Sequence, residues 1–418
     1  MNPEAVLAQA LKQAEAAEVY CLRQEETSVA FEANRLKHSS TRYVEKLALR
    51  VIREGRMGAA TTDGDGGVVE QAVEASRVGN QVHFQFPPQS PPSPVEVYDP
   101  TITGISPQDM VASGHALIQQ ALEHTPELHC EARVIKGISE VTLLNSAGSQ
   151  IHYQRSFFWI DLEVALIQGD DMLFVGDDQM SARPIKDVEP IGREVISQLE
   201  RAKRQAKIAT RTLPVILTPH GVRNALISPL SMAFNGRMVV QGASPLSRRL
   251  GEKVFHPQFN LRDDATIPYR PSSRPWDDEG IPGQSTPLID QGVVANFFYD
   301  LDSAVKAGSK STGNAIRLPE GTINPQASSL IITEGKLGLE AMIRDIKEGL
   351  LIDNLMGADQ GNILGGEFSG NVLLGYKIEN GEVVGRVKNT MVSGNIFNVL
   401  REIEAIGGGG RWVGNLYS

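Results

Sequence analysis

Cysteine is scarce in this chain of 418 residues, which contains only Cys21 and Cys130. Two cysteines so far apart exclude a disulfide framework and a cysteine-rich zinc site, and they fit a reducing cytoplasm. No apolar run approaches the ~18 residues that a membrane-spanning helix needs. The N-terminus has no basic region leading into an apolar core, as a secretory signal would. We therefore expect a cytoplasmic protein that does not enter membranes.

Positive charge is also in deficit, because 40 Lys and Arg residues stand against 50 Asp and Glu, a formal net charge of −10. This acidic balance argues against general affinity for nucleic acids. Hydrophobic residues make up 41% and charged residues 22% of the chain, which are ordinary values for a folded globular protein. We therefore expect a folded protein rather than a mainly disordered one.

The character of the sequence changes near residue 210. Before that point helical and strand-like patterns alternate, and the best helix start is Ser106, with proline at the first position and an acid in the first turn. After it, short strands separated by glycine dominate, and Asn380-Gly381 predicts a β-hairpin. The sequence therefore predicts an α+β protein. An N-terminal α/β domain covers residues 1–210, and a mainly antiparallel β domain with a few helices covers residues 211–418.

Hydrophobic periodicity predicts further elements in both halves. Helices are expected at residues 1–17, 67–78, 106–123, 189–206, 338–347 and 395–405. Short strands are expected at residues 19–22, 28–32, 46–53, 130–136 and 141–144. Residues 87–94 contain five prolines and are expected to form an extended connector.

Familiar catalytic motifs are missing from the sequence. It contains no HExxH or HExxxH, no G-x-S-x-G, and no phosphate-binding loop with the required spacing. The two cysteines are interpreted as small buried hydrophobic residues. Three carboxylates stand together at Asp277, Asp278 and Glu279, where they would either bind a hard cation or fix a loop. Composition alone favours the loop.

Several short segments occur in a fixed order along the chain. They are residues 51–58 (VIREGRMG), 276–282 (WDDEGIP), 286–292 (TPLIDQG), 311–314 (STGN), 343–350 (IRDIKEGL), 366–369 (GEFS), 378–381 (IENG) and 393–395 (SGN). In this order they resemble the TldD/PmbA family, long labelled modulators of DNA gyrase and classed with peptidases. Each segment alone is a weak signal, but the series spans nearly the whole chain.

The resemblance implies a particular branch of that family. TldD-type members resemble metalloproteases, with a helix bearing HExxxH and a distant cysteine as third ligand, whereas PmbA/TldE-type members lack this motif. Here the stretch taken as equivalent is 217–223, where Thr218 and Arg223 stand in place of the histidines and Pro219 in place of the glutamate. No cysteine follows Cys130. The resemblance thus implies a PmbA/TldE-like chain with no zinc or other cofactor of its own, and no catalytic residue is assigned.

The resemblance also implies a TldD-like subunit as partner, which would supply the metal. This chain would then help to enclose a chamber and hold an unfolded peptide by β-strand addition. The candidate cleft-wall residues are Ser311, Thr312, Gly313, Asn314, Gly365 and Gly366. Glycine permits close approach of a peptide backbone; the alternative, that these segments are only turns, stays open. Because edge strands need covering, we also expect the isolated chain to form a two-fold homodimer.

Two functions of other classes remain open. The first is a stand-alone homodimeric peptidase with an unrecognised metal site, for which the carboxylates of residues 277–279 are the candidates. The second is a non-enzymatic protein-binding modulator, for example of DNA gyrase.

Overall fold

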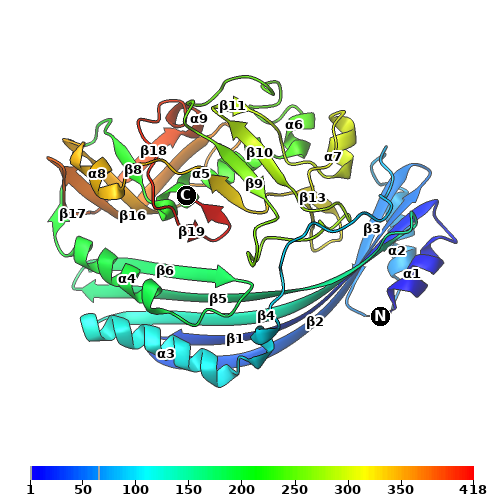
Figure 1. The fold of residues 1–418 in the computed structure, drawn as a ribbon, viewed down its shortest axis with the longest axis horizontal. Coiled ribbons are helices and arrows are strands. Elements are labelled where there is room, and N and C mark those ends of the chain that lie inside the picture. The colour runs from blue at the N-terminus through cyan, green and yellow to red at the C-terminus, as the bar shows by residue number, and fades with distance from the viewer. Residues whose placement is uncertain (1, 65) are drawn as a thin grey trace.

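The computed structural model describes residues 2–64 and 66–418. It shows a mixed α+β protein in which strands predominate over helices, as the sequence predicts. A long curved sheet from the first half of the chain lies on one side, and the strands and short helices of the second half lie across it (Figure 1). No helix among the described residues combines the length and the apolar character needed to span a membrane.

Six antiparallel strands form the first sheet, in the order β3-β2-β1-β4-β5-β6. They are β1 (Ala16–Glu32), β2 (Arg35–Arg53), β3 (Arg56–Thr62), β4 (His129–Asn145), β5 (Gln150–Gln168) and β6 (Asp171–Ser181). The short strands predicted at 19–22 and 28–32 are one strand, and those at 130–136 and 141–144 are another. The polar residues 23–27 show no apolar alternation, yet they remain in β1 because β2 and β4 pair with them on both sides.

Helices cover one face of this sheet at two places. The described helices of this half are α1 (Pro3–Ala10), α2 (Val68–Ser76), η1 (Pro100–Gly104), α3 (Pro107–His124) and α4 (Glu189–Ala202). Helix α3 begins where predicted, because Ser106 and Asp109 form a reciprocal capping box. Helix α1 is shorter than predicted, since the chain enters β1 at Ala16.

The two borders of the first sheet differ. At the β6 border, side chains take the place of a neighbouring strand. Arg386 Nη1 donates to the Met172 carbonyl at 3.2 Å, Gln198 bonds the N–H and C=O of Gly176 at 3.0 and 3.2 Å, and Arg270 Nη1 donates to the Met180 carbonyl at 3.1 Å. At the other border, β3 pairs only with residues 47–53 of β2. Residues 35–46 of β2 therefore have no strand on their outer side among the described residues.

The second half adds two further sheets and one hairpin. One sheet follows the order β7-β17-β16-β15-β8, with β18 also on β16; the other follows β11-β10-β9-β14-β20-β19; and β12 pairs β13. The strands are β7 (Gln205–Ala206), β8 (Val215–Leu217), β9 (Leu261–Asp264), β10 (Ser285–Asp290), β11 (Val293–Val294), β12 (Ala315–Arg317), β13 (Ile323–Pro325), β14 (Leu330–Ile332), β15 (Glu348–Met356), β16 (Glu367–Glu379), β17 (Glu382–Val387), β18 (Met391–Asn395), β19 (Trp412–Val413) and β20 (Leu416–Tyr417). The predicted Asn380-Gly381 turn joins β16 to β17, with φ of 50° and 81°.

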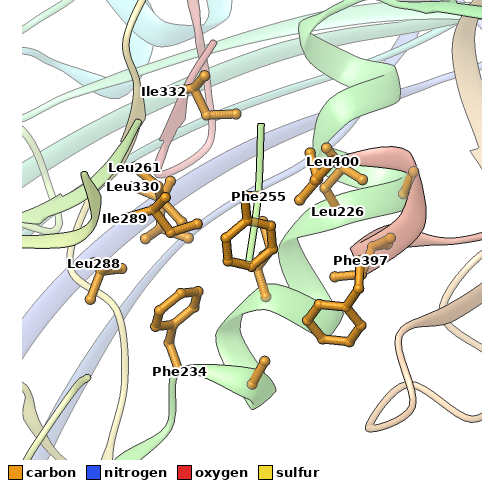
Figure 2. Packing of buried hydrophobic residues seen from close by; sticks show 14 of the residues in the cluster. Leu226, Phe234, Phe255, Leu261, Leu288, Ile289, Leu330, Ile332, Phe397 and Leu400 are labelled. Carbon is orange, nitrogen blue, oxygen red and sulfur yellow. The ribbon is translucent and has the colours of Figure 1, made fainter. Parts of the chain in front are cut away.

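Five helices accompany these sheets in the described residues: α5 (Pro219–Ala233), α6 (Gly236–Val240), α7 (Leu301–Lys306), α8 (Leu339–Arg344) and α9 (Ile396–Val399). Helix α5 packs into an apolar core where Phe234, Phe255 and Phe397 meet leucine and isoleucine side chains from the sheets (Figure 2). Helices α8 and α9 are shorter than the predicted spans of 338–347 and 395–405.

One hydrophobic core is shared by both halves of the chain. It contains Val134 of β4 and Leu199 of α4 together with Ile216, Leu351 and Tyr376 of the second half. The Tyr376 hydroxyl also donates to a carbonyl of α4, at 3.2 Å. The two halves thus share a core. We still propose that residues 1–210 and 211–418 are separate domains, as the sequence predicts.

Candidate functional site

The start of helix α5 carries the stretch that was compared with a zinc-binding helix. Thr218 caps the helix, and its hydroxyl donates to Asp353 Oδ1 at 2.5 Å. Pro219 is the first helical residue, and the Arg223 guanidinium lies against Gly414. A hydroxyl, a proline and a guanidinium are not the donor set that zinc requires. Within residues 2–64 and 66–418, no three His, Cys, Asp or Glu side chains are grouped to hold a metal ion.

A charged cluster occupies this end of α5 instead. His220 Nε2 lies 3.2 Å from Asp177 Oδ1 of β6, and the Arg411 guanidinium contacts the same carboxylate. Burial alone would lower the pKa of His220, but the hydrogen bond to Asp177 and the charges of Asp353 and Asp177 outweigh it and raise the pKa. The cluster therefore ties α5 to β6 and to the C-terminal segment.

A cavity of about 490 Å³ lies beside this cluster. It is bounded by β6, the first turns of α4, the loop at Arg270 and residues 410–417. Apolar side chains form part of its wall, and they are Met180, Ile185, Pro190 and Trp412. Charged side chains form another part, and they are Asp177, Asp178, Glu194, Arg270 and Arg411. Sequence reasoning missed this site, because its walls come from four separated parts of the chain.

The adjacent carboxylates of residues 277–279 diverge rather than converge. Asp277 accepts the N–H groups of Glu279, Ile281 and Ala315 at 2.9 to 3.0 Å. Asp278 Oδ2 accepts the N–H of Arg317 at 2.8 Å. These oxygens are thus engaged by backbone donors and fix the surrounding loops.

A buried ion network connects the first sheet to these loops. Arg50 of β2 donates to both oxygens of Glu18 of β1 at 3.0 Å and, through Nη1, to Glu279 at 2.7 Å. Arg317 also donates to Glu18. Burial alone would raise the pKa of Glu18, but Arg50 and Arg317 hold it below its ordinary value. No local pattern reveals this network, since Glu18 and Arg317 are 299 positions apart.

The first predicted cleft segment, residues 311–314, turns its polar side chains inward. Asn314 Nδ2 donates to Asp263 Oδ2 at 2.6 Å, and Thr312 Oγ1 accepts the Tyr299 N–H at 2.7 Å and donates to Asn314 Oδ1 at 2.6 Å. Both Thr312 and Asn314 are buried, whereas Ser311 is half-buried. Gly313 has φ of +70°, and the Pro282 carbonyl oxygen lies 2.5 Å from where a Cβ would stand.

The second predicted segment, Gly365 and Gly366, lies elsewhere. The Gly365 carbonyl accepts a hydrogen bond from Asn395 Nδ2 at 2.7 Å, and Gly366 packs closely against the Phe397 ring. Figure 1 shows α7 and β13, beside residues 311–314, on one side of the second half, and β18 and α9, beside residue 366, on the other. The fold does not bring the two segments together, and their contact with a peptide stays a prediction.

Comparison with protein families matches both halves of the chain. A model described as the PmbA/TldA metallopeptidase C-terminal domain matches residues 210–418, and one described as PmbA/TldA metallopeptidase domain 1 matches residues 17–76. An uncharacterized protein of Methanocaldococcus jannaschii is 25% identical over 389 residues, which cover 92% of this chain and 90% of that protein. A metalloprotease PmbA homolog of Haemophilus influenzae is 28% identical over 224 residues, which cover 53% of this chain and 46% of the homolog.

Solved structures share the fold over its whole length. TldE from Thermococcus kodakarensis aligns with a TM-score of 0.88 at 24% identity, covering 99% of this chain and 97% of TldE. A Thermotoga maritima protein whose name refers to a modulator of a DNA gyrase aligns with a TM-score of 0.89 at 20% identity, covering 99% of this chain and 96% of that protein. At these identities the likeness establishes the fold.

Proposed function

This chain belongs to the PmbA/TldD family, and from that premise we propose that it is a metal-free, PmbA/TldE-type subunit that acts with a TldD-type metallopeptidase on unfolded peptides. The observation that carries the proposal is the donor set at α5. Thr218, Pro219 and Arg223 offer no zinc ligand, and the full sequence contains no HExxxH motif. The metal would belong to the partner subunit, and this chain would contribute binding surface.

The uncovered part of β2 supports a role in strand pairing. Residues 35–46 are mostly exposed and polar, and include Lys37, Arg42 and the 73% exposed Tyr43. Along residues 35–44, an extended peptide or a strand of a partner could pair with an edge that no other strand of the described chain covers. Positive charges on such an edge restrain uncontrolled sheet extension, so pairing requires a selected partner. We propose the same edge for homodimer formation when the chain is alone.

The test is to purify the chain and measure its metal content and its hydrolysis of an unfolded protein such as casein. The same measurements are made on a TldD-type subunit alone and on the mixture. We expect no stoichiometric metal in this chain, and hydrolysis that appears or rises strongly only in the mixture. A TldD-type subunit with its metal-binding histidines replaced by alanine is the matched control, and its mixture should be inactive.

Stoichiometric zinc and chelator-sensitive hydrolysis by this chain alone would overturn the proposal in favour of a stand-alone peptidase. The alternative modulator function would gain support if the chain bound a topoisomerase directly while leaving hydrolysis by the TldD-type subunit unchanged.

A further inference from the structure

Arg270 carries a buried charge that no carboxylate contacts as an ion pair in the described structure. The residue is 8% exposed and takes part in no ion pair within residues 2–64 and 66–418. Its guanidinium donates to two carbonyl groups, with Nη1 3.1 Å from Met180 O and Nη2 2.5 Å from Gly414 O. A guanidinium has five N–H donors, so most of its capacity is unused, and Nε is buried without a partner in the described chain.

Such a charge is costly to bury without a counter-ion. Burial lowers the pKa of Arg270 to about 10, against the weaker opposing attraction of Asp178. Its two bonds have a structural role, because they join the β6 border to the C-terminal segment. They do not supply negative charge, since carbonyl groups are neutral. Arg270 is therefore a buried cation without an ion-pair partner in the described residues, in the wall of a cavity.

The cavity of about 490 Å³ places this charge beside apolar surface. The Trp412 ring lies against the guanidinium, with its centroid 4.0 Å from the Arg270 carbon Cζ. Met180, Ile185 and Pro190 form nearby apolar walls. Binding pockets commonly combine mostly apolar walls with a few charged groups that orient the ligand.

The other charges of the cavity disfavour a ligand with more than one negative charge. Arg411 is already engaged by Asp177 and lies 3.9 Å from Glu194. Asp178 accepts the Trp159 indole N–H at 3.2 Å and also lines the cavity. The lining holds three carboxylates (Asp177, Asp178, Glu194) against two guanidiniums (Arg270, Arg411), so a phosphate with two charges would be repelled more strongly than a single carboxylate that lies against Arg270.

We propose that this cavity binds one carboxylate attached to an apolar group, with Arg270 as its counter-ion and Trp412 as an apolar wall. Under the proposed function, on which this part rests, the ligand is the C-terminal carboxylate of a peptide ending in an apolar residue. A free acylated amino acid has the same chemistry and is the other source that the experiment distinguishes.

The experiment measures binding to the isolated full-length chain by titration calorimetry. The probes are N-acetyl-phenylalanine, its amide, and an unstructured eight-residue peptide ending in phenylalanine with either a free or an amidated C-terminus. We expect both free acids to bind and both amides to bind at least tenfold more weakly. Inorganic phosphate should not compete.

Two variants connect binding to the cavity. Arg270→Met should weaken binding of the free acids at least tenfold. The matched control is Arg183→Met, because Arg183 also stacks on an aromatic ring, Tyr269, but is exposed and paired with Asp99 at 3.5 Å. Should Arg270→Met fail to fold, Gln179→Glu keeps both carbonyl bonds of Arg270 and adds a carboxylate to the cavity wall. It should also abolish binding.

Equal affinity for acids and amides, or binding unchanged in Arg270→Met and Gln179→Glu, would overturn the proposal. Binding of N-acetyl-phenylalanine without binding of the free-acid peptide would support the cavity site and overturn the peptide source. Because this readout is binding to the chain alone, it is separate from the metal and hydrolysis measurements that test the proposed function.

Discussion

Arg50 and Glu279 form a buried ion pair across 229 positions of sequence, with Arg50 Nη1 2.7 Å from Glu279 Oε1. The pair joins β2 of the first sheet to the loop that precedes β10. Replacing Arg50 with methionine would leave Glu18 and Glu279 buried without their main cationic partner. We expect Arg50→Met to lower the free energy of unfolding by about 3–5 kcal/mol, measured by urea denaturation.

The control for this variant is Arg23→Met. Arg23 pairs with Glu45 at 3.1 Å on the surface of the same sheet, and its side chain is half exposed. Its replacement should cost less than about 1 kcal/mol. Similar costs for the two variants would show that the Arg50 network does not hold the halves together.

Two reasons favour glycine at position 313: its positive φ and the lack of space for a side chain. Its φ of +70° disfavours any side chain, and a Cβ would also meet the Pro282 carbonyl. Gly308 has a similar φ of +65° but open space around the Cβ position. We expect Gly308→Ala to cost about 1–2 kcal/mol and Gly313→Ala clearly more, measured by denaturant unfolding. Equal losses would mean that the 311–314 loop can move away from Pro282.

His220 gives the stability a dependence on pH. Its pKa in the folded chain is raised above the ordinary 6.5, so the charged form is favoured by folding. The stabilisation is fully present below about pH 6.5 and is lost as the pH rises through the folded pKa. We expect the loss of stability between about pH 6 and about pH 8.5 to be smaller in His220→Gln than in the natural chain.

The exposed His38 provides the comparison, because no hydrogen bond or ion pair of its side chain occurs in the described residues. His38→Gln is the matched control, since it makes the same substitution without removing a contact like that of His220 with Asp177. A His220→Gln profile parallel to that of the natural chain would show that the pair with Asp177 does not favour the charged imidazole.

Metal removal should leave the fold unaffected. A ligand that binds only the folded state raises the unfolding temperature, and its removal lowers it. Because the carboxylates of Asp277 and Asp278 are engaged by backbone N–H groups, we expect equal thermal unfolding midpoints with and without a chelator. A fall of several degrees on chelation would reveal a structural metal that the donor arrangement does not suggest.

The Gln198 side chain hydrogen-bonds the outward-facing backbone N–H and C=O of Gly176 in the border strand β6. Its replacement by leucine would leave one N–H and one C=O without partners, at a cost of about 1–3 kcal/mol for each group that stays buried. We expect a loss of about 2 kcal/mol or more in chemical denaturation, and a greater tendency to aggregate. Gln119→Leu, which removes only an exposed bond to Glu123, should be nearly neutral.

Local features of the fold were predictable from the sequence. The capping box of Ser106 and Asp109 and the turn at Asn380-Gly381 depend on neighbours within a few residues. Strand length was not predictable, because polar residues 23–27 are held in β1 by its two neighbouring strands rather than by their own pattern. Strand β6 was missed for a similar reason, since its outer groups are bonded by distant side chains such as Arg386.

The candidate site was less predictable than the fold. The family resemblance depends on segments such as 276–282 and 311–314, whose polar side chains mainly bond to other parts of the same chain. The cavity beside Arg270 depends on residues that no local motif connects. The sequence cannot show that Arg270 lacks an ion-pair partner, because this depends on which residues the fold places around it.

The unequal borders of the first sheet also set a distance between the two proposed binding sites. The proposed strand addition lies at β2, and the cavity lies at β6, four strand positions away. At about 4.8 Å per position, these sites are roughly 19 Å apart across the sheet. An extended peptide advances about 3.3 Å per residue, so about six residues would be needed to span this gap, in addition to those that pair along β2. Affinity should therefore increase stepwise with peptide length if both sites act on one ligand.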